Sequence, residues 1–296
     1  MGATNQMVQP LDTSLAARTT AHRAEQRLSS LVPIQSGNGI PFFCVHGSGG
    51  NVLNFRDLAK RLGASQAFYG LQAPGVDGRA MVASVEELAD QYLTELLQVT
   101  PKGPYLLGGY SSGGIIAFEI ARRLHSAGQQ TLLVLLDTFA PGVVPRGPTA
   151  SEHVKALLEH GPRYLTRRVR AKLDREGEAL SLALKIRFYQ QQRAPLPYEL
   201  REHQLSEAAL AAAARYKPAA HHGPSILYRA AHTDSCFLHA GPRRGWDQLL
   251  PNLRTFEVTG DHTNFIQAPH VSSLTTHLAQ VLREAGAVAP PRATMA

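Results

Sequence analysis

The sequence predicts an α/β fold, in which a mostly parallel central sheet carries helices on both faces and a helical insertion. Apolar runs of strand length alternate with helical segments between residues 40 and 137. A serine flanked by glycines lies where one of these strands turns into a helix. The alternation stops near residue 144 and resumes near residue 225. Continuous apolar runs are typical of strands that are buried on both faces of a parallel sheet.

The elements expected before the insertion follow in order along the chain. The residues 54–62 place apolar side chains on one helical face, and Ser84 with Glu87 forms a capping box at the start of a helix. The expected strands are 40–45, 67–71, 104–107 and 132–136, and the expected helices are 54–62, 84–99 and 115–124.

The insertion, about 144–205, contains helical segments punctuated by prolines and no convincing strand. Such an insertion commonly covers the strand ends of an open sheet. Helices are expected at 152–158, 163–173, 179–191, 206–216 and 270–285, and strands at 225–229 and 253–258. Residues 1–30 are predicted to be a leader or linker, helical around 14–31, residues 31–287 one domain, and residues 288–296 a disordered tail.

The composition is that of an ordinary globular protein: of 296 residues, 44% are hydrophobic and 18% are charged. No apolar run approaches the ~20 residues that span a bilayer. Arg18, Arg23 and Arg27 interrupt the apolar centre that a signal peptide would need. The two cysteines, Cys44 and Cys236, provide no disulfide framework, so we expect a cytoplasmic protein.

Metal, nucleotide and nucleic-acid binding are all disfavoured. The sequence has 13 histidines but no H-E-x-x-H motif, and two cysteines cannot build a thiolate cage. Gly47 and Gly49 begin a dinucleotide fingerprint, but Val52 occupies its third glycine position. The net charge of +7 comes with only 7% aromatic residues and no basic-aromatic RNA motif. We therefore expect no cofactor and an acidic protein partner.

The central motif is Gly109-Tyr110-Ser111-Ser112-Gly113, a G-x-S-x-G sequence. Glycine is needed on both sides because strand and helix approach too closely for a β-carbon. The turn holds Ser111 in strained geometry, exposes its hydroxyl above the sheet and directs the Ser112 amide to the same space. This pattern predicts a nucleophile, while a glycine-rich turn in another kind of α/β protein is the structural alternative.

A serine nucleophile needs a base and an acid, and the sequence offers them. His262 follows the last strand, so its loop can carry the ring above Ser111. Two acids can orient that ring: Asp137 ends the strand after the serine helix, and Asp234 follows the next strand. We favour Asp137, which directly follows an unbroken apolar strand. Asp261 is expected to stabilise its own loop.

Attack on an acyl carbonyl creates an oxyanion, which two backbone amides must receive. One is the amide of Ser112, directly after the nucleophile. The other is expected from the glycine-rich loop after the first core strand, and we choose Ser48 within His46-Gly47-Ser48-Gly49.

Together these motifs resemble a type I thioesterase domain of nonribosomal peptide and polyketide synthases. The resemblance covers roughly residues 31–285 and rests on five spaced segments: 43–50, 69–73, 109–114, 136–137 and 260–262. It implies an α/β-hydrolase fold with a helical lid, and an acyl-enzyme on Ser111 formed from a thioester on a carrier protein's phosphopantetheine arm. Release would follow by hydrolysis, macrocyclisation or transfer.

The resemblance also bears on the acid and on the alternatives. The family pattern matches Asp137, whereas related stand-alone editing thioesterases place the acid one strand later, which matches Asp234. The alternatives are therefore an editing thioesterase or a carboxylesterase that uses Asp234, and a catalytically silent binding module. The insertion is rich in basic residues that are expected to attract an acidic acyl or peptidyl carrier, although a solvated helix face would look the same. These basic residues are Arg163, Arg167, Arg168, Arg170, Lys172, Arg175, Lys185, Arg187 and Arg193.

Overall fold

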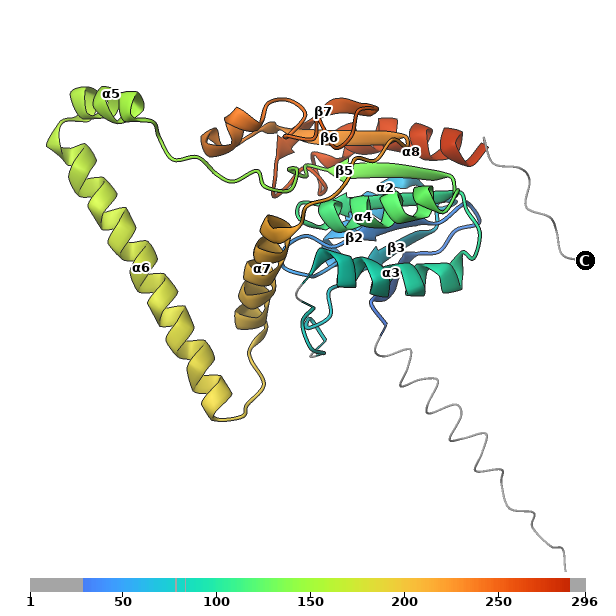
Figure 1. Cartoon of the computed structure of the whole chain (residues 1–296), viewed down its shortest axis with the longest axis horizontal. Coiled ribbons are helices and arrows are strands. Elements are labelled where there is room, and N and C mark those ends of the chain that lie inside the picture. Colours follow the sequence, from blue (N-terminus) through green and yellow to red (C-terminus); the bar gives the residue numbers. More distant parts are fainter. Residues whose placement is uncertain (1–28, 78, 83, 288–296) are drawn as a thin grey trace, which may run out of the picture.

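A computed structural model describes residues 29–77, 79–82 and 84–287. Its centre is a seven-stranded sheet with the order β1-β3-β2-β4-β5-β6-β7 (Figure 1). β1 is antiparallel to β3, and all the other neighbours are parallel. The strands are β1 Leu31–Gln35, β2 Phe42–Val45, β3 Phe68–Leu71, β4 Tyr105–Tyr110, β5 Thr131–Leu136, β6 Ser225–His232 and β7 Leu253–Asp261.

Helices cover both faces of this sheet, as the sequence predicts. α3 and α4 pack on one face, and α2 and α8 pack on the other. The flanking elements are η1 Leu53–Phe55, α2 Arg56–Leu62, α3 Val85–Val99, α4 Gly113–Ser126 and α8 Val271–Ala287. β5 shows why a continuous apolar run is needed: Leu133 and Leu135 face α3 and α4, whereas Leu132, Val134 and Leu136 face α2 and α8.

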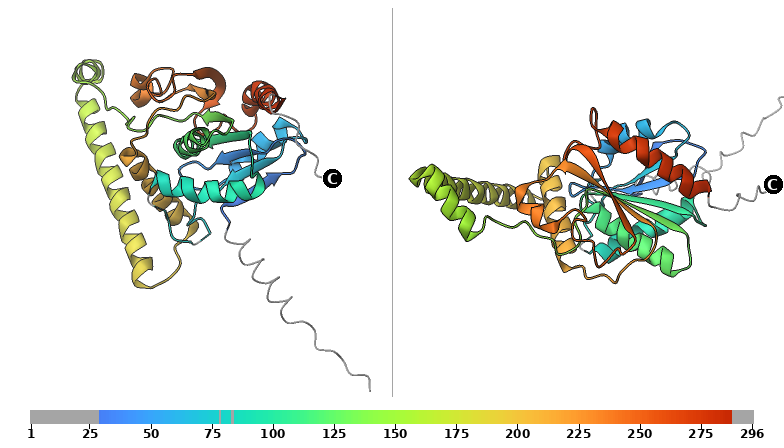
Figure 2. Two further views of the ribbon diagram at one scale, coloured as in Figure 1. Left: turned by 45° about the vertical axis from the view of Figure 1, so that its right-hand side comes forward. Right: turned by 90° about the horizontal axis from the view of Figure 1, so that it is seen from above.

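Three helices lie between β5 and β6: α5 Ala150–His160 and α6 Pro162–Gln191 fall within the expected insertion, about 144–205, and α7 Tyr198–Arg215 extends past its end. Figures 1 and 2 show α7 beside the sheet and α6 projecting away from it. The sequence predicts two helices at 163–173 and 179–191, but α6 is continuous through Gly177. One glycine costs a helix only about 1 kcal/mol. The pairs Arg170–Asp174 and Lys172–Glu176 bridge successive turns just before it.

The structure also contains elements that the sequence did not reveal. β1 replaces the end of the helix expected around 14–31, whose remaining residues, like the tail 288–296, lie outside the described part of the chain. Pro33 concealed this strand, yet proline is tolerated because β1 is the edge of the sheet. η2, Ser235–Ala240, is a short helix after β6. α7 starts earlier than the predicted helix 206–216.

Candidate active site

The turn between β4 and α4 holds Ser111 in a left-handed backbone conformation, with φ of 55°. A β-carbon on Gly109 would lie 2.4 Å from the carbonyl oxygen of Gly113, and one on Gly113 would lie 1.8 Å from that of His46. The amide of Ser111 donates to the carbonyl of Leu136 at 2.9 Å. The G-x-S-x-G glycines are therefore required by close backbone approach, as the sequence predicts.

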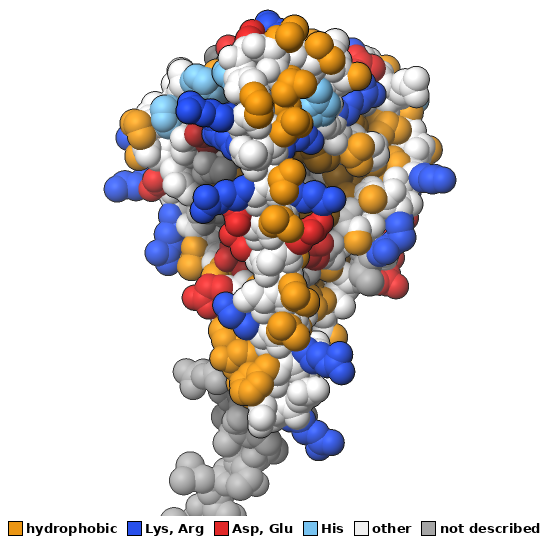
Figure 3. Space-filling model, turned by 90° about the vertical axis from the view of Figure 1, so that its left-hand side faces the viewer, with side chains coloured by type: hydrophobic (Ala, Val, Ile, Leu, Met, Phe, Trp, Pro, Cys, Tyr) orange, Lys and Arg blue, Asp and Glu red, His pale blue; other side chains and the backbone are white. Residues whose placement is uncertain are grey.

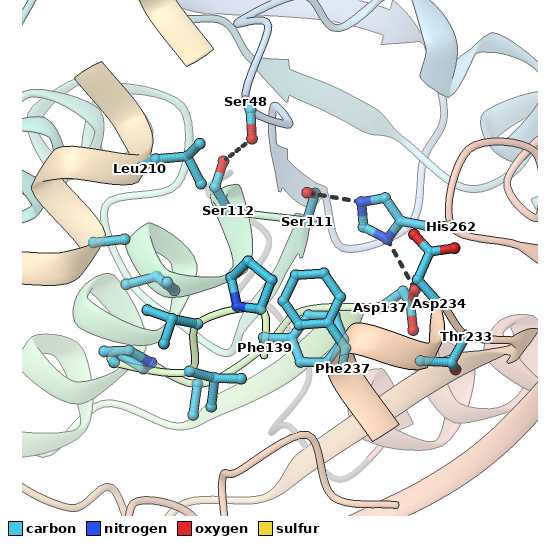
Figure 4. Close-up of a pocket in the computed structure, with 18 of the residues that line it drawn as sticks. Ser48, Ser111, Ser112, Asp137, Phe139, Leu210, Thr233, Asp234, Phe237 and His262 are labelled. Carbon is cyan, nitrogen blue, oxygen red and sulfur yellow. Dashed lines mark hydrogen bonds and ion pairs between the residues drawn. The ribbon is translucent and has the colours of Figure 1, made fainter. Parts of the chain in front are cut away.

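His262 lies beside this serine, although 151 positions separate the two residues in the chain. Its Nε2 is 2.9 Å from Ser111 Oγ, and its Nδ1 is 2.8 Å from Asp137 Oδ2 (Figure 4). The ring stacks on Tyr110 with 5.4 Å between centroids, and the Tyr110 hydroxyl donates to the His262 carbonyl at 2.5 Å. These contacts fix both the ring and its backbone.

Asp137 follows β5 and is buried, with φ of 48°. Its Oδ1 accepts from the Ala230 amide at 3.0 Å and from Arg244 Nη2 at 2.7 Å, while Oδ2 faces His262. Burial raises the pKa of Asp137, but the hydrogen bond from His262 and the charge of Arg244 outweigh it and hold that pKa below its ordinary value. The carboxylate is thus ionised at neutral pH.

The other two acids have different surroundings. Asp234 lines the pocket near this cluster (Figure 4), but the carboxylate on His262 Nδ1 is that of Asp137. Asp261 accepts from the amide and hydroxyl of Thr263 and from Asn264 Nδ2, at 2.6 to 2.8 Å. Asp261 therefore ties its own loop together, the role that the sequence suggests for it.

The glycine-rich loop after β2 approaches the serine from the other side. Ser48 Oγ donates to Ser112 Oγ at 3.0 Å, so the two residues expected to supply oxyanion amides lie together (Figure 4). His46 is buried beneath the loop, with Nδ1 2.5 Å from the Gly47 carbonyl and Nε2 2.9 Å from the Tyr92 hydroxyl. This ring holds the loop against α3.

α7 packs directly on the same loop. The Tyr198 hydroxyl accepts from Asn51 Nδ2 at 3.1 Å. A β-carbon on Gly49 would meet the Glu202 carboxylate at 2.6 Å, and one on Gly50 would lie 3.2 Å from Leu205. The glycine-rich loop is therefore confined between the core and α7.

A pocket of about 580 Å³ opens at Ser111. Its polar lining includes His262, Asp234 and Thr263. Most of the remaining lining is apolar and comes from α4, α7, η2 and the segment after β5; it includes Ile115, Phe139, Val143, Leu210 and Phe237. Phe139 and Phe237 stack with 4.5 Å between ring centroids (Figure 4). Such a pocket suits an apolar chain whose reactive end reaches the serine.

Sequence reasoning missed Arg244 and the contacts of Tyr110 and His46. The arginine reaches Asp137 across 107 positions, and nothing in the Arg243-Arg244-Gly245 sequence distinguishes it from a surface pair. Across residues 29–77, 79–82 and 84–287, no group of three His, Cys, Asp or Glu side chains could hold a metal ion. No helix in that part of the chain is long and apolar enough to cross a membrane.

Comparisons with known proteins identify the family of this chain. The model of the thioesterase domain family matches residues 40–284. Atromentin synthetase nps3 from Serpula lacrymans is 36% identical over 132 residues, which are 44% of this chain and 14% of that protein. Chondramide synthase cmdD from Chondromyces crocatus is 29% identical over 301 residues, 93% of this chain and 7% of that protein. The chain thus spans a small fraction of these relatives.

Solved structures show the same fold. Holo-AB3403, a four-domain nonribosomal peptide synthetase, aligns with a TM-score of 0.63 and 25% identity, over 86% of this chain and 20% of that one. The NocB thioesterase domain, in a covalent complex with a fluorophosphonate nocardicin G analogue, aligns with a TM-score of 0.58 and 24% identity. The alignment covers 82% of this chain and 94% of that one.

Sheet, serine turn and insertion together define an α/β-hydrolase fold. The chain belongs to the thioesterase domain family, and it resembles the terminal thioesterase domains of nonribosomal peptide synthetases.

Proposed function

We propose that this domain releases an acyl chain from the phosphopantetheine thioester of a carrier protein through an acyl-enzyme on Ser111. The observation that carries the proposal is the hydrogen-bonded chain Ser111–His262–Asp137 at the mouth of an apolar pocket. A serine hydroxyl is a poor nucleophile unless a base takes its proton, and an oriented imidazole is such a base.

In the first half-reaction, His262 Nε2 takes the proton of Ser111 as Oγ attacks the thioester carbonyl. The amides of Ser48 and Ser112 receive the oxyanion. When the carbon–sulfur bond breaks, the imidazolium gives its proton to the leaving thiolate, and the acyl chain remains on Ser111. Asp137 stabilises the charged ring during both transfers.

In the second half-reaction, the acceptor gives its proton to His262 and attacks the ester, and Ser111 Oγ leaves with that proton. Water as acceptor gives hydrolysis, a hydroxyl or amine of the chain itself gives a macrocycle, and an external nucleophile gives transfer. Which acceptor reacts depends on how well the pocket holds it and excludes water.

The proposed partner is an acyl or peptidyl carrier, and the surface of α6 supports this proposal. The α6 side chains are mostly exposed, and a row of apolar residues runs along the helix with basic and, near its middle, acidic side chains beside it (Figure 3). A basic surface attracts an acidic partner and raises the rate of encounter. The exposed apolar residues are Leu165, Val169, Leu173, Leu180, Leu184 and Phe188.

The direct test is intact-mass measurement after mixing the protein with a carrier loaded with an acyl thioester. The parent protein is expected to gain the mass of the acyl chain, and Ser111→Ala is expected to gain none. Ser112→Ala is the matched control, because it keeps the backbone amide and should still be acylated. Acylation of Ser111→Ala would contradict the proposal.

Substrate class is tested by comparing an acyl-pantetheine thioester with the matching oxygen ester. We expect a higher kcat/KM for the thioester. A strong preference for the oxygen ester would instead indicate a carboxylesterase. The identity of the product then distinguishes hydrolysis from cyclisation and transfer.

A further inference from the structure

Arg244 is a buried arginine that contacts the carboxylate of Asp137. Its Nη2 lies 2.7 Å from Oδ1, whereas His262 contacts the other oxygen, Oδ2. The side chains of Arg244 and Asp137 are 3% and 2% exposed. Charged groups are almost never so fully buried unless they are paired, so this contact makes Arg244 part of the environment of the proposed acid.

Other contacts fix the guanidinium in place. Nη2 also donates to Thr233 Oγ1 at 2.8 Å, and the guanidinium carbon lies 4.5 Å from the ring centroid of Phe139. The backbone of Arg244 has φ of 52°, and its carbonyl accepts from the Ala140 amide at 2.9 Å. A non-glycine residue in this conformation costs about 1 kcal/mol or more, so the surrounding contacts must hold it there.

We propose that Arg244 is a positioning residue, which holds Asp137 in the orientation that serves His262 and offsets the negative charge facing the imidazole. The inference rests on the proposed function, since it takes His262 as the base and Ser111 as the nucleophile. Oδ1 is held by Arg244 and by the Ala230 amide, so the carboxylate cannot rotate, and Oδ2 stays on His262.

The charge effect has a definite sign. A carboxylate alone stabilises the protonated imidazole strongly, whereas a carboxylate paired with a guanidinium does so less. Without the Arg244 charge, the carboxylate would face the imidazole uncompensated, and the acid limb of the pH–rate profile should move to higher pH. The other titratable groups around the ring are on different elements and remain in such a variant: Tyr110, His232, Asp234 and Asp261.

The test measures the rate at which a fluorophosphonate labels Ser111, as a function of pH, in five proteins. These are the parent, Arg244→Met, Arg244→Lys, Asp137→Asn and the double variant Asp137→Asn/Arg244→Met. Arg244→Met is expected to lower the rate by about tenfold to a hundredfold and to move the acid limb of the pH profile upward. Arg244→Lys keeps the charge and should keep the acid limb of the parent.

The double variant distinguishes positioning from a merely structural role. If Arg244 acts through Asp137, its loss adds little once the carboxylate is gone, so the double variant should label within about threefold of Asp137→Asn. The double variant also contains no unpaired buried charge, so it should fold even if Arg244→Met alone does not.

Two results would overturn the inference: a full additional loss of rate in the double variant, or an unchanged acid limb in Arg244→Met. Failure of the parent to react with the probe would instead count against the proposed function, so the two failures are distinguishable.

Discussion

The carbonyl of His46 lies where a β-carbon on Gly113 would have to go, only 1.8 Å away. His46 directly follows β2 and Gly113 begins α4, so regular elements hold both backbones in place. The new β-carbon would meet a backbone oxygen, so no side chain can move aside to relieve the clash, as one could at an ordinary packing contact. Gly113 thus determines how closely the serine turn approaches the glycine-rich loop.

Gly113→Ala is expected to lower the free energy of unfolding by about 3 kcal/mol or more and to abolish labelling of Ser111. The matched control is Gly177→Ala in α6, where the new β-carbon has no atom within 4 Å other than those of its chain neighbours and its own helix backbone. That variant should keep full activity and gain about 0.5–1 kcal/mol, because alanine favours helix over glycine. Chemical denaturation measures both, and equal effects would contradict the steric argument.

At the residue scale, the sequence predicts that two side chains meet where each of them directly follows a strand of the sheet. Ser111, Asp137 and His262 all lie at the carboxyl ends of parallel strands, so the topology alone brings them to one edge of the sheet. Arg244 lies in a loop between η2 and β7, and no periodicity reports where such a loop runs. Its partner could therefore be identified only from the structure.

Among the elements, α6 differs most from its prediction. Gly177 and the polar stretch around it suggested a break between two helices. The helix continues because ion pairs at i, i+4 spacing support it and it contains few residues that disfavour a helix. Buried strands such as β5 were predictable from their apolar runs, whereas β1, with Pro33 and only half-buried side chains, was not.

The basic residues of α6 give a prediction at this scale. Charge reversal at Arg163, Arg167 and Arg187, all exposed, should lower kcat/KM for a carrier-bound thioester by about tenfold. The same change should leave kcat/KM for a small soluble thioester unchanged, because the site itself is untouched.

The control for that experiment is charge reversal of three exposed basic residues on α2: Arg56, Lys60 and Arg61. It changes the net charge equally on another part of the molecule. If both triple variants lose the same activity, net charge and not the α6 surface attracts the carrier. Rising salt should likewise slow the carrier-bound substrate more than the soluble one.

At the scale of the whole molecule, two buried histidines make the fold sensitive to mild acid. Burial, and to a smaller extent the nearby His125, lower the pKa of His221 to about 4, and burial lowers the pKa of His46 to about 4. Between their ordinary value near 6.5 and 4, the unfolded chain binds protons that the folded chain does not. Stability therefore falls as the pH decreases through this range.

His221→Leu removes one of these protonation sites at a buried position whose two ring nitrogens have no hydrogen-bond partner among the described residues. At pH 5 the variant should recover about 2 kcal/mol of the stability that the parent loses relative to pH 7. Thermal unfolding at both pH values measures this difference. An exposed histidine on another element provides the control, since His160→Gln should retain the pH dependence of the parent. If His221→Leu loses as much stability between pH 7 and pH 5 as the parent, protonation of His221 is not the cause of that loss.

α7 connects distant parts of the molecule. Its first turns contact the loop of Ser48 through Tyr198, Glu202 and Leu205, and its N-terminus follows α6 after a short turn. α6 has 30 residues and is therefore a stiff rod about 45 Å long. A protein bound at the far end of α6 would therefore exert its force through α7 on the loop that carries Ser48, the residue proposed to supply an oxyanion amide.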